Sequence, residues 1–267
     1  MVEFQKNSNG FTLIEMSIVL VIIGLITGAI FAGSSLIELS KVQSVATDFR
    51  KIQTSLNIYQ DKYGYLPGDH PNAYSYFDNT GGSSICGQNN NTNSGCNGNG
   101  DGKFSRGTGM ANEYLRSWVH LNLSNILPNS LTGALSGGAF VPGDNVYESR
   151  IKSAGFNLIL GSGVSGGSVA FGRGPGNAIQ FGRTAGTSLR APVLTPAQAR
   201  SIDSKIDDGT SSSGKLMGLR TGGGSFNALG SCSDNPALFF DYQGAYASAD
   251  YLLSNTNKSC YLIFWLN

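Results

Sequence analysis

An uninterrupted apolar run near the N-terminus limits how this chain can fold more than any other feature. Residues 11–31 read FTLIEMSIVLVIIGLITGAIF, a run of 21 residues with a single charge, that of Glu15. As an α-helix the run is about 31 Å long, which matches the hydrocarbon core of a bilayer. A secretory signal peptide has a shorter apolar stretch and a small-residue cleavage site directly after it. The run therefore predicts a transmembrane helix.

The one charge in this run needs a partner. A carboxylate at bilayer depth costs about 3 kcal/mol, and the positive end of the helix dipole returns only about 0.3–1 kcal/mol. Glu15 is therefore expected to meet a specific cation. The α-amine of Phe11 would supply it if the chain were cut between Gly10 and Phe11, and the amine can belong to a neighbouring chain.

The string Gly10-Phe11-Thr12-Leu13-Ile14-Glu15, followed by the apolar run, resembles the cleavage and methylation signal of type IV prepilins and pseudopilins. The resemblance implies that a membrane aspartyl protease, the prepilin peptidase, cuts after Gly10. It implies that Phe11 becomes the methylated N-terminus, an N-methylphenylalanine, and that Glu15 pairs with the amine of an adjacent subunit. The competing interpretation is an ordinary signal anchor in which the glutamate occurs by chance.

The apolar pattern continues beyond the membrane run as a single stripe. Apolar residues recur at steps of three and four, which lays them along one helix face: Val42, Val45, Phe49, Ile52, Leu56, Tyr59 and Tyr63. Gly64 is expected to end the helix. The sequence thus predicts a leader over residues 1–10, a helix over 11–63 and a globular head over 64–267. The stripe alone is also compatible with a coiled-coil stalk.

The rest of the chain favours short strands with long connections. Charged residues make up only 13% of the sequence, and most of the 37 glycines follow Asn79. Helices are predicted over 110–127 and from a Thr195 cap to Asp207-Asp208-Gly209. Strands of an antiparallel sheet are predicted over 156–160, 169–171, 178–181, 216–219, 238–242 and 261–266. The expected fold class is α+β, with the long N-terminal helix packed on a C-terminal antiparallel β-sheet, as in a type IV pilin.

Four cysteines are present, and an even number in an exported chain indicates disulfides. Three pairings are open, of which Cys86–Cys96 with Cys232–Cys260 is the most local. The segment bounded by Cys232 and Cys260 also resembles the disulfide-bounded loop of many type IV pilins. Buried reduced thiols are the alternative.

One loop has the pattern of a calcium ligand set. Residues 97–102 read NGNGDG, with oxygen-bearing side chains at alternate positions and a glycine sixth, which resembles the start of a calcium-binding loop. The candidate ligands are Asn97, Asn99 and Asp101. The acidic residue expected twelfth is replaced by Thr108, and Glu113 is expected to be too far away. A plain turn is the competing interpretation, and no other cofactor is predicted.

No catalytic constellation stands out. The two histidines, His70 and His120, lack metal-ligand spacing and are expected to be surface or structural groups. Residues 163–167 fit G-x-S-x-G, but a strand-like run follows a glycine cluster there, whereas a nucleophile elbow needs a strand before it and a helix after it. The paired Asp207-Asp208 is expected to mark a helix end. The net charge of +1 gives no indication of nucleic-acid binding.

Taken with the resemblance, the sequence predicts a structural subunit, not an enzyme, of a type IV pilus-like filament. Its expected partners are the prepilin peptidase, sister pilin subunits and a pilus assembly machine. The segment MVEFQKNSNG holds one Lys and one Glu, so charge alone does not orient the helix. The resemblance implies a cytoplasmic leader, a precursor in the bacterial inner membrane, and a filament at the cell surface or in the periplasm. The alternatives are a pseudopilin of a type II secretion or DNA-uptake system, and a membrane-anchored binding module that never polymerises.

Overall fold

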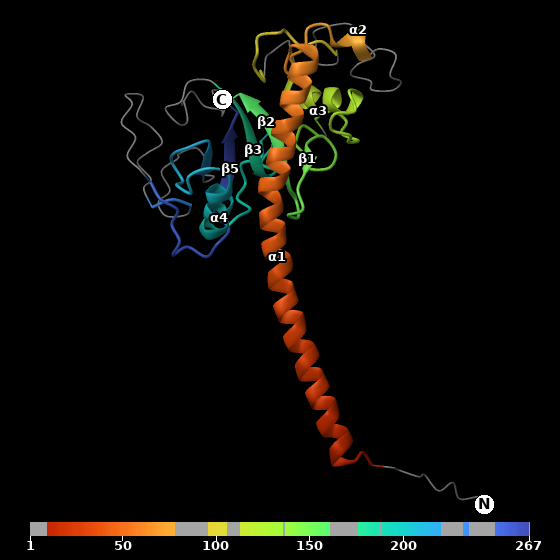
Figure 1. Cartoon of the computed structure of the whole chain (residues 1–267), viewed down its shortest axis with the longest axis vertical. Helices are drawn as coiled ribbons and strands as arrows, with labels where there is room; N and C mark the ends of the chain where they lie inside the picture. Colours follow the sequence, from red (N-terminus) through yellow and green to blue (C-terminus); the bar gives the residue numbers. More distant parts are fainter. Residues whose placement is uncertain are drawn as a thin grey trace, which may run out of the picture. The chain divides into compact units, whose positions relative to one another are not determined.

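A computed structural model describes residues 10–77, 96–105, 113–135, 137–160, 176–186, 188–219, 232–234 and 249–266 (Figure 1). The elements follow one another as α1 (Leu13–Tyr63), α2 (Ala73–Phe77), α3 (Glu113–Leu123), β1 (Tyr147–Glu148), β2 (Ala154–Leu160), β3 (Asn177–Arg183), α4 (Pro196–Ile206), β4 (Leu216–Leu219) and β5 (Tyr261–Trp265). The fold is α+β, with a long N-terminal helix followed by an antiparallel five-stranded sheet, as predicted.

Two compact units make up the chain, Met1–Lys41 and Val42–Asn267, and α1 continues through the division. In the first unit every residue from 10 to 32 is exposed, so the apolar side chains of α1 point outward on all sides. Among the described residues, α1 is the one helix long and apolar enough to cross a membrane. The predicted division between helix and head at residue 63 stays a prediction, since the second half of α1 groups with the head.

The second half of α1 contributes its apolar stripe to the core of the second unit, as its periodicity predicts. Six of the seven stripe residues are buried: Val42, Val45, Phe49, Ile52, Leu56 and Tyr59. The ring of Phe49 stacks on that of Phe264 in β5, with ring centroids 4.1 Å apart. At the end of the helix, Gly64 adopts a φ of 76° and its N–H donates to the carbonyl of Gln60 at 2.8 Å. Gly64 therefore ends α1 as predicted, because a left-handed residue is the usual helix terminator.

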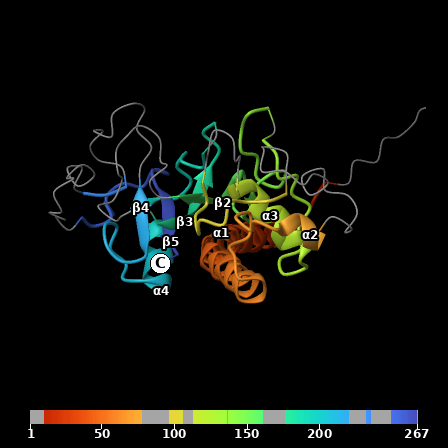
Figure 2. The same cartoon turned by 90° about the horizontal axis from the view of Figure 1, so that it is seen from above.

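The sheet has the strand order β1-β2-β3-β5-β4, and every neighbouring pair is antiparallel. One face, with Phe156, Phe181 and Phe264, belongs to the same apolar core as the α1 stripe. The opposite face carries a second buried cluster that includes Met217 and Ile263. Seen from above, α3 lies beside α1 next to β2, and α4 lies next to β4 (Figure 2). Both faces are buried, which accounts for the nearly continuous apolar runs of the strands.

Local capping sets the ends of the shorter helices. Thr195 and Gln198 form a reciprocal capping box at the start of α4, and Pro196 occupies its first turn, as predicted. The predicted helix over 110–127 is α3, which is shorter. It ends at Leu123 because Asn125 adopts a left-handed φ of 58°, and residues 106–112 lie outside the described residues.

Some expectations about the strands and helices were incomplete. The predicted strands at 156–160, 178–181, 216–219 and 261–266 correspond to β2, β3, β4 and β5. Those predicted at 169–171 and 238–242 lie outside the described residues. Neither α2 nor β1 was predicted, because elements of five and two residues are too short to show a periodic pattern.

Candidate processing and assembly site

The proposed cleavage point lies just before α1. Residues 10–12 have no regular secondary structure, and the helix begins at Leu13. Gly10 is exposed and has no neighbouring atom within 4 Å of the position that a Cβ would occupy. The side chain of Phe11 is 80% exposed. The peptide bond between Gly10 and Phe11 is therefore outside the helix and open to an enzyme.

Glu15 is bound to Thr12 in a reciprocal helix cap. The Thr12 backbone N–H donates to Glu15 Oε2 at 2.8 Å, the Thr12 hydroxyl donates to the same oxygen at 2.7 Å, and the Glu15 N–H donates to Thr12 Oγ1 at 3.3 Å. This is a capping box, which satisfies two N–H groups that a helix start leaves unpaired. Within the described residues no donor reaches the other carboxylate oxygen, Oε1. The sequence analysis missed the cap, although the T-x-x-E spacing signals it.

The rest of the membrane run presents a uniformly apolar surface. Its hydroxyl groups are paired inside the helix, because Ser17 and Thr27 donate to the carbonyls of Ile14 and Ile23. Just beyond the run, Ser34 donates to the carbonyl of Phe31 in the same way. Large apolar side chains, among them Leu20, Leu25 and Phe31, are exposed around the whole circumference. Such a surface needs lipid or other apolar helices around it.

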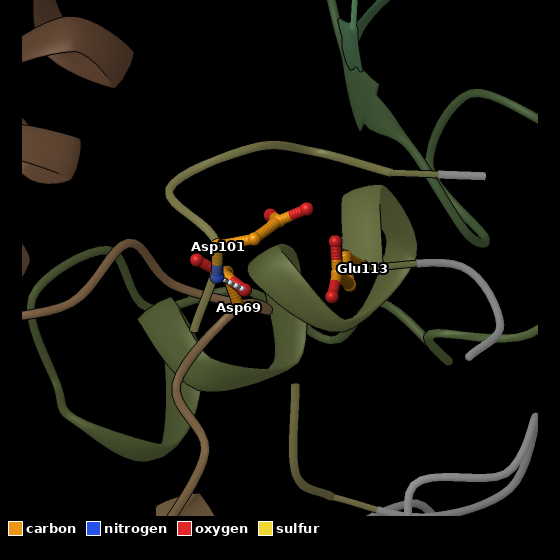
Figure 3. Close-up of side chains that lie close together, drawn as sticks. All are labelled: Asp69, Asp101 and Glu113. Carbon is orange, nitrogen blue, oxygen red and sulfur yellow. Dashed lines mark hydrogen bonds between the residues drawn. The ribbon is translucent and has the colours of Figure 1, made fainter. Parts of the chain in front are cut away.

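The predicted calcium loop is organised around a residue that the sequence analysis did not select. Asp69 accepts backbone N–H groups from Gly100 (2.6 Å) and Asp101 (3.2 Å) on Oδ1, and from Gly102 (2.7 Å) on Oδ2. Figure 3 shows Asp69 beside Asp101, with Glu113 of α3 nearby. Asn97 and Asn99, two of the predicted ligands, instead accept backbone N–H groups of Tyr74 and Asp101 through their side-chain oxygens.

Glu113 reaches this loop, contrary to the expectation that it would be too far away. Its Oε1 accepts the N–H of Asn99 at 3.3 Å, and its Oε2 accepts the N–H and hydroxyl of Ser105. One carboxylate oxygen each of Asp69, Asp101 and Glu113 lie within 4.8 Å of one another. The expectation failed because it placed ligands by a continuous-loop spacing, whereas the chain folds α3 back onto the loop.

This carboxylate group offers the oxygen ligands that calcium prefers. However, both oxygens of Asp69, both of Glu113 and one of Asp101 already accept hydrogen bonds from the protein. Burial raises the pKa of Asp69 and of Glu113. The negative charge of Asp101 raises the pKa of Asp69 further, and that of Asp69 raises the pKa of Glu113 further. The hydrogen bonds alone account for the loop as a structural clamp, and calcium at this position stays a prediction.

Of the predicted disulfides, Cys232–Cys260 is formed, with its Cα atoms 5.0 Å apart. Cys96 is also disulfide-bonded, and its predicted partner Cys86 lies outside the described residues.

Three groups were considered as catalytic candidates: Asp207-Asp208, residues 163–167 and the two histidines. Asp207 and Asp208 follow the last residue of α4 and accept backbone N–H groups of Leu216 and Thr210, which confirms the predicted helix end. Residues 163–167 lie outside the described residues. His70 and His120 are both buried, so a surface position is excluded for either.

Comparison with known proteins finds a similarity for one part of the chain. No curated protein and no solved structure matches it. The family model of the prokaryotic N-terminal methylation motif matches residues 5–31, which include Gly10, Phe11, the Thr12–Glu15 cap and the whole apolar run. The chain therefore carries the prepilin-type cleavage and methylation signal of type IV pilins and pseudopilins, on an α+β layout like that of a pilin.

Proposed function

We propose that this chain is a structural subunit of a type IV pilus-like filament, cut after Gly10 and assembled through α1. One observation carries the proposal: the methylation motif at residues 5–31 coincides with a helix that is apolar and exposed on every side, with one carboxylate near its start. The signal implies processing by a prepilin peptidase. The subunit has no catalytic turnover in this proposal.

The exposed first half of α1 requires an apolar environment. Removing one large aliphatic side chain from water stabilises by about 1.5–3 kcal/mol, and residues 13–31 expose many of them. Before assembly the inner membrane covers these side chains. In the filament the same surface packs on the helices of sister subunits. Lipid tails are as apolar as the helix, so close packing and a specific polar contact must favour the filament.

Glu15 supplies that polar contact in this proposal. Cleavage creates a positive amine on Phe11, which becomes methylated, and this amine pairs with Glu15 of an adjacent subunit. The Thr12 cap holds one carboxylate oxygen and leaves the other available. Leaving Glu15 unpaired at bilayer depth costs about 3 kcal/mol, so the ion pair favours the assembled state and fixes the stagger between neighbouring helices.

The second unit, from Val42 onward, comprises the predicted head together with the second half of α1, which contributes to its core. This unit forms the outer surface of the filament and is called the head below. The assembled product is a filament at the cell surface or a periplasmic pseudopilus. The methylation motif is common to pilins and pseudopilins, so a pseudopilin of a secretion or DNA-uptake system is the second candidate. The genes next to this one would separate the two.

The experiment follows a tagged chain in cells that contain a pilus assembly machine. Material sheared from the cells is separated from membranes, and the tag is quantified in both fractions and located by electron microscopy. The proposal predicts tagged filaments in the sheared fraction, and none in cells that lack the assembly machine. A membrane-anchored binding module that never polymerises would stay in the membrane fraction in both strains.

A further inference from the structure

Both histidines of the chain meet at one buried hydroxyl group. The chain has two histidines, His70 and His120, and the Tyr59 hydroxyl lies 3.1 Å from His70 Nδ1 and 3.4 Å from His120 Nδ1. All three side chains are buried. Tyr59 comes from the last turns of α1, His70 from the segment that follows it, and His120 from α3. The cluster thus joins three parts of the second unit.

The backbone fixes the protonation state of His120. The Gly68 N–H donates to His120 Nδ1 at 2.8 Å, so Nδ1 carries no hydrogen. The other ring nitrogen, Nε2, lies 3.0 Å from the carbonyl oxygen of Cys96 and therefore carries the hydrogen. A neutral imidazole offers one acceptor and one donor, and this site uses both. A second proton would have to enter at Nδ1, directly opposite the Gly68 N–H.

The Gly68 contact holds a tightly packed segment. Gly68 has a φ of +84°, and a Cβ on it would lie 2.0 Å from the Glu113 carbonyl oxygen, so its backbone touches α3. The Ser117 hydroxyl donates to the Pro67 carbonyl at 2.7 Å beside it.

A second segment, the loop at 96–105, contacts the segment at 64–77. The loop at 96–105 is bound to the 64–77 segment because the Gly98 N–H donates to the His70 carbonyl and the Gly100 N–H donates to the Asp69 carbonyl, both at 2.9 Å. The loop is also bound to α3 directly, through Glu113 and through Nε2 of His120, so it stays on α3 when the 64–77 segment leaves.

We propose that His120 is an acid-sensitive latch: a proton added to its Nδ1 breaks the Gly68 contact and releases residues 64–77 from α3. The latch is closed while His120 is neutral. This inference concerns the head and does not depend on filament assembly.

The direction of the pH effect follows from the burial of the ring. Burial lowers the pKa of His120 to about 3, and it lowers the pKa of His70 as well. In the released segment, the pKa of His120 returns towards its ordinary value of 6.5. Because the closed state has the lower pKa, its stability is present above pH 6.5 and is lost as the pH falls towards 3. At pH 4.5 this histidine alone makes release about 100-fold more favourable than at pH 7.5.

Other titratable groups lie on the elements packed against the two rings. Tyr59, Tyr63, Tyr65 and Tyr76 contact the rings, and Arg116 acts on His120. Asp69 is next to His70 in the chain and interacts with Asp101 and Glu113. Arg116 acts in the same direction as burial on the pKa of His120. Asp69 and Glu113 act against release in acid, because burial raises their pKa values and they therefore bind protons more readily in the closed state. The contribution of His120 to the pH dependence of release must therefore be measured as a difference between the parent chain and a His120 variant.

The test uses the full chain in detergent micelles and measures hydrogen exchange of peptides that contain Gly68, from pH 7.5 to pH 4.5, corrected for intrinsic exchange rates. His120→Gln keeps one acceptor and one donor and does not titrate, and His70→Gln is the matched control. We expect opening of the Gly68 peptide to increase about 100-fold more between these pH values in the parent chain than in His120→Gln. His70→Gln should keep most of that difference, and peptides from β3 should show no such change.

Equal pH dependence in the parent chain and in His120→Gln would overturn the proposal, as would its loss in His70→Gln alone. Should His120→Gln not fold, nitrogen NMR of the parent imidazoles decides. The latch predicts that His120 Nδ1 stays unprotonated until the Gly68 amide loses protection. A His120 ring that titrates near pH 6.5 while the Gly68 amide remains protected would refute it.

Discussion

One oxygen of the Glu15 carboxylate lies 2.8 Å from the backbone nitrogen of Thr12 and 2.7 Å from its hydroxyl. This contact sets the start of α1 just after the bond between Gly10 and Phe11. The second oxygen has no donor within the described residues. The same carboxylate is therefore able to cap its own helix and to accept a hydrogen bond from another chain. Substitutions can separate these two roles.

Replacing Glu15 tests the role of its charge. Glu15→Ala removes the cap and the charge, whereas Glu15→Gln removes the charge and keeps an acceptor for Thr12. We expect both variants to insert into the membrane, because removing a carboxylate at bilayer depth lowers the insertion cost by about 3 kcal/mol. Both should be depleted at least about tenfold from sheared filaments, since an unpaired buried amine costs about 3–5 kcal/mol. Immunoblots of sheared and membrane fractions give the ratio.

Normal incorporation of Glu15→Gln would show that the charge of Glu15 has no role in assembly. If only Glu15→Ala failed, the helix cap and not the ion pair would be the important contact.

A substitution at Gly10 tests whether the chain is cut after this residue. A bulky side chain in Gly10→Leu would fill the space next to the proposed cleavage point, and we expect the variant to keep its leader and remain in the membrane. Gly24→Leu is the matched control, since Gly24 is exposed within α1 and nothing lies near its Cβ position. Gel mobility and intact mass distinguish the forms. A mature chain that begins at Phe11 in Gly10→Leu would refute the assignment.

Phe49 tests the attachment of α1 to the sheet. Its side chain is 3% exposed and stacks on Phe264, so we expect Phe49→Ala to lower the free energy of unfolding of the head by about 3–5 kcal/mol. The side chain of Ile58, on the same helix, is 47% exposed. Ile58→Ala should therefore change the free energy of unfolding by less than about 1 kcal/mol. Trp118 and Trp265 are both buried in the head, so tryptophan fluorescence during denaturant unfolding reports the effect. Similar losses in the two variants would contradict this packing.

The burial of Asp203 predicts that stability depends on pH in the opposite direction to the effect of His120. It accepts hydrogen bonds from the Tyr251 hydroxyl (2.8 Å) and the Gly209 N–H (3.2 Å), and burial raises its pKa to about 7. A raised pKa in the folded state gives stability that is present below the unfolded pKa and lost as the pH rises through 7. Asp203→Asn keeps the size of the side chain and cannot ionise.

We therefore expect the unfolding free energy of the parent chain to fall, relative to Asp203→Asn, between pH 4 and about pH 7 and to level off above that. Denaturant midpoints at pH 5 and pH 8 measure the change. A constant difference between the two proteins would contradict a neutral Asp203 in the folded head.

The elements with a strong local pattern were predictable from the sequence. The apolar run and its stripe predict α1, Gly64 marks its end, and Thr195-Pro196 marks the start of α4. These features depend on residues a few positions apart, so propensity and capping decide them. The Thr12–Glu15 cap belongs to the same class, because its T-x-x-E spacing is local, although Glu15 was interpreted only as a charge that needs a partner.

Contacts between distant residues were not predictable in this way. Asp69, Asp101 and Glu113 come together because the start of α3 folds back onto the loop that precedes it, and nothing in a local pattern specifies that contact. His70 and His120 have no common motif, yet Tyr59 joins them. The register of β3 against β5, with Phe181 opposite Leu262, likewise depends on how both sheet faces are buried.

The most direct test of the central claim is mass spectrometry of the N-terminus of the native protein, taken from membranes and from sheared extracellular filaments. Our account predicts that the protein in the filaments begins at Phe11 with one added methyl group and lacks residues 1–10. A native protein that retains those residues and is found only as a single chain in the membrane would contradict it.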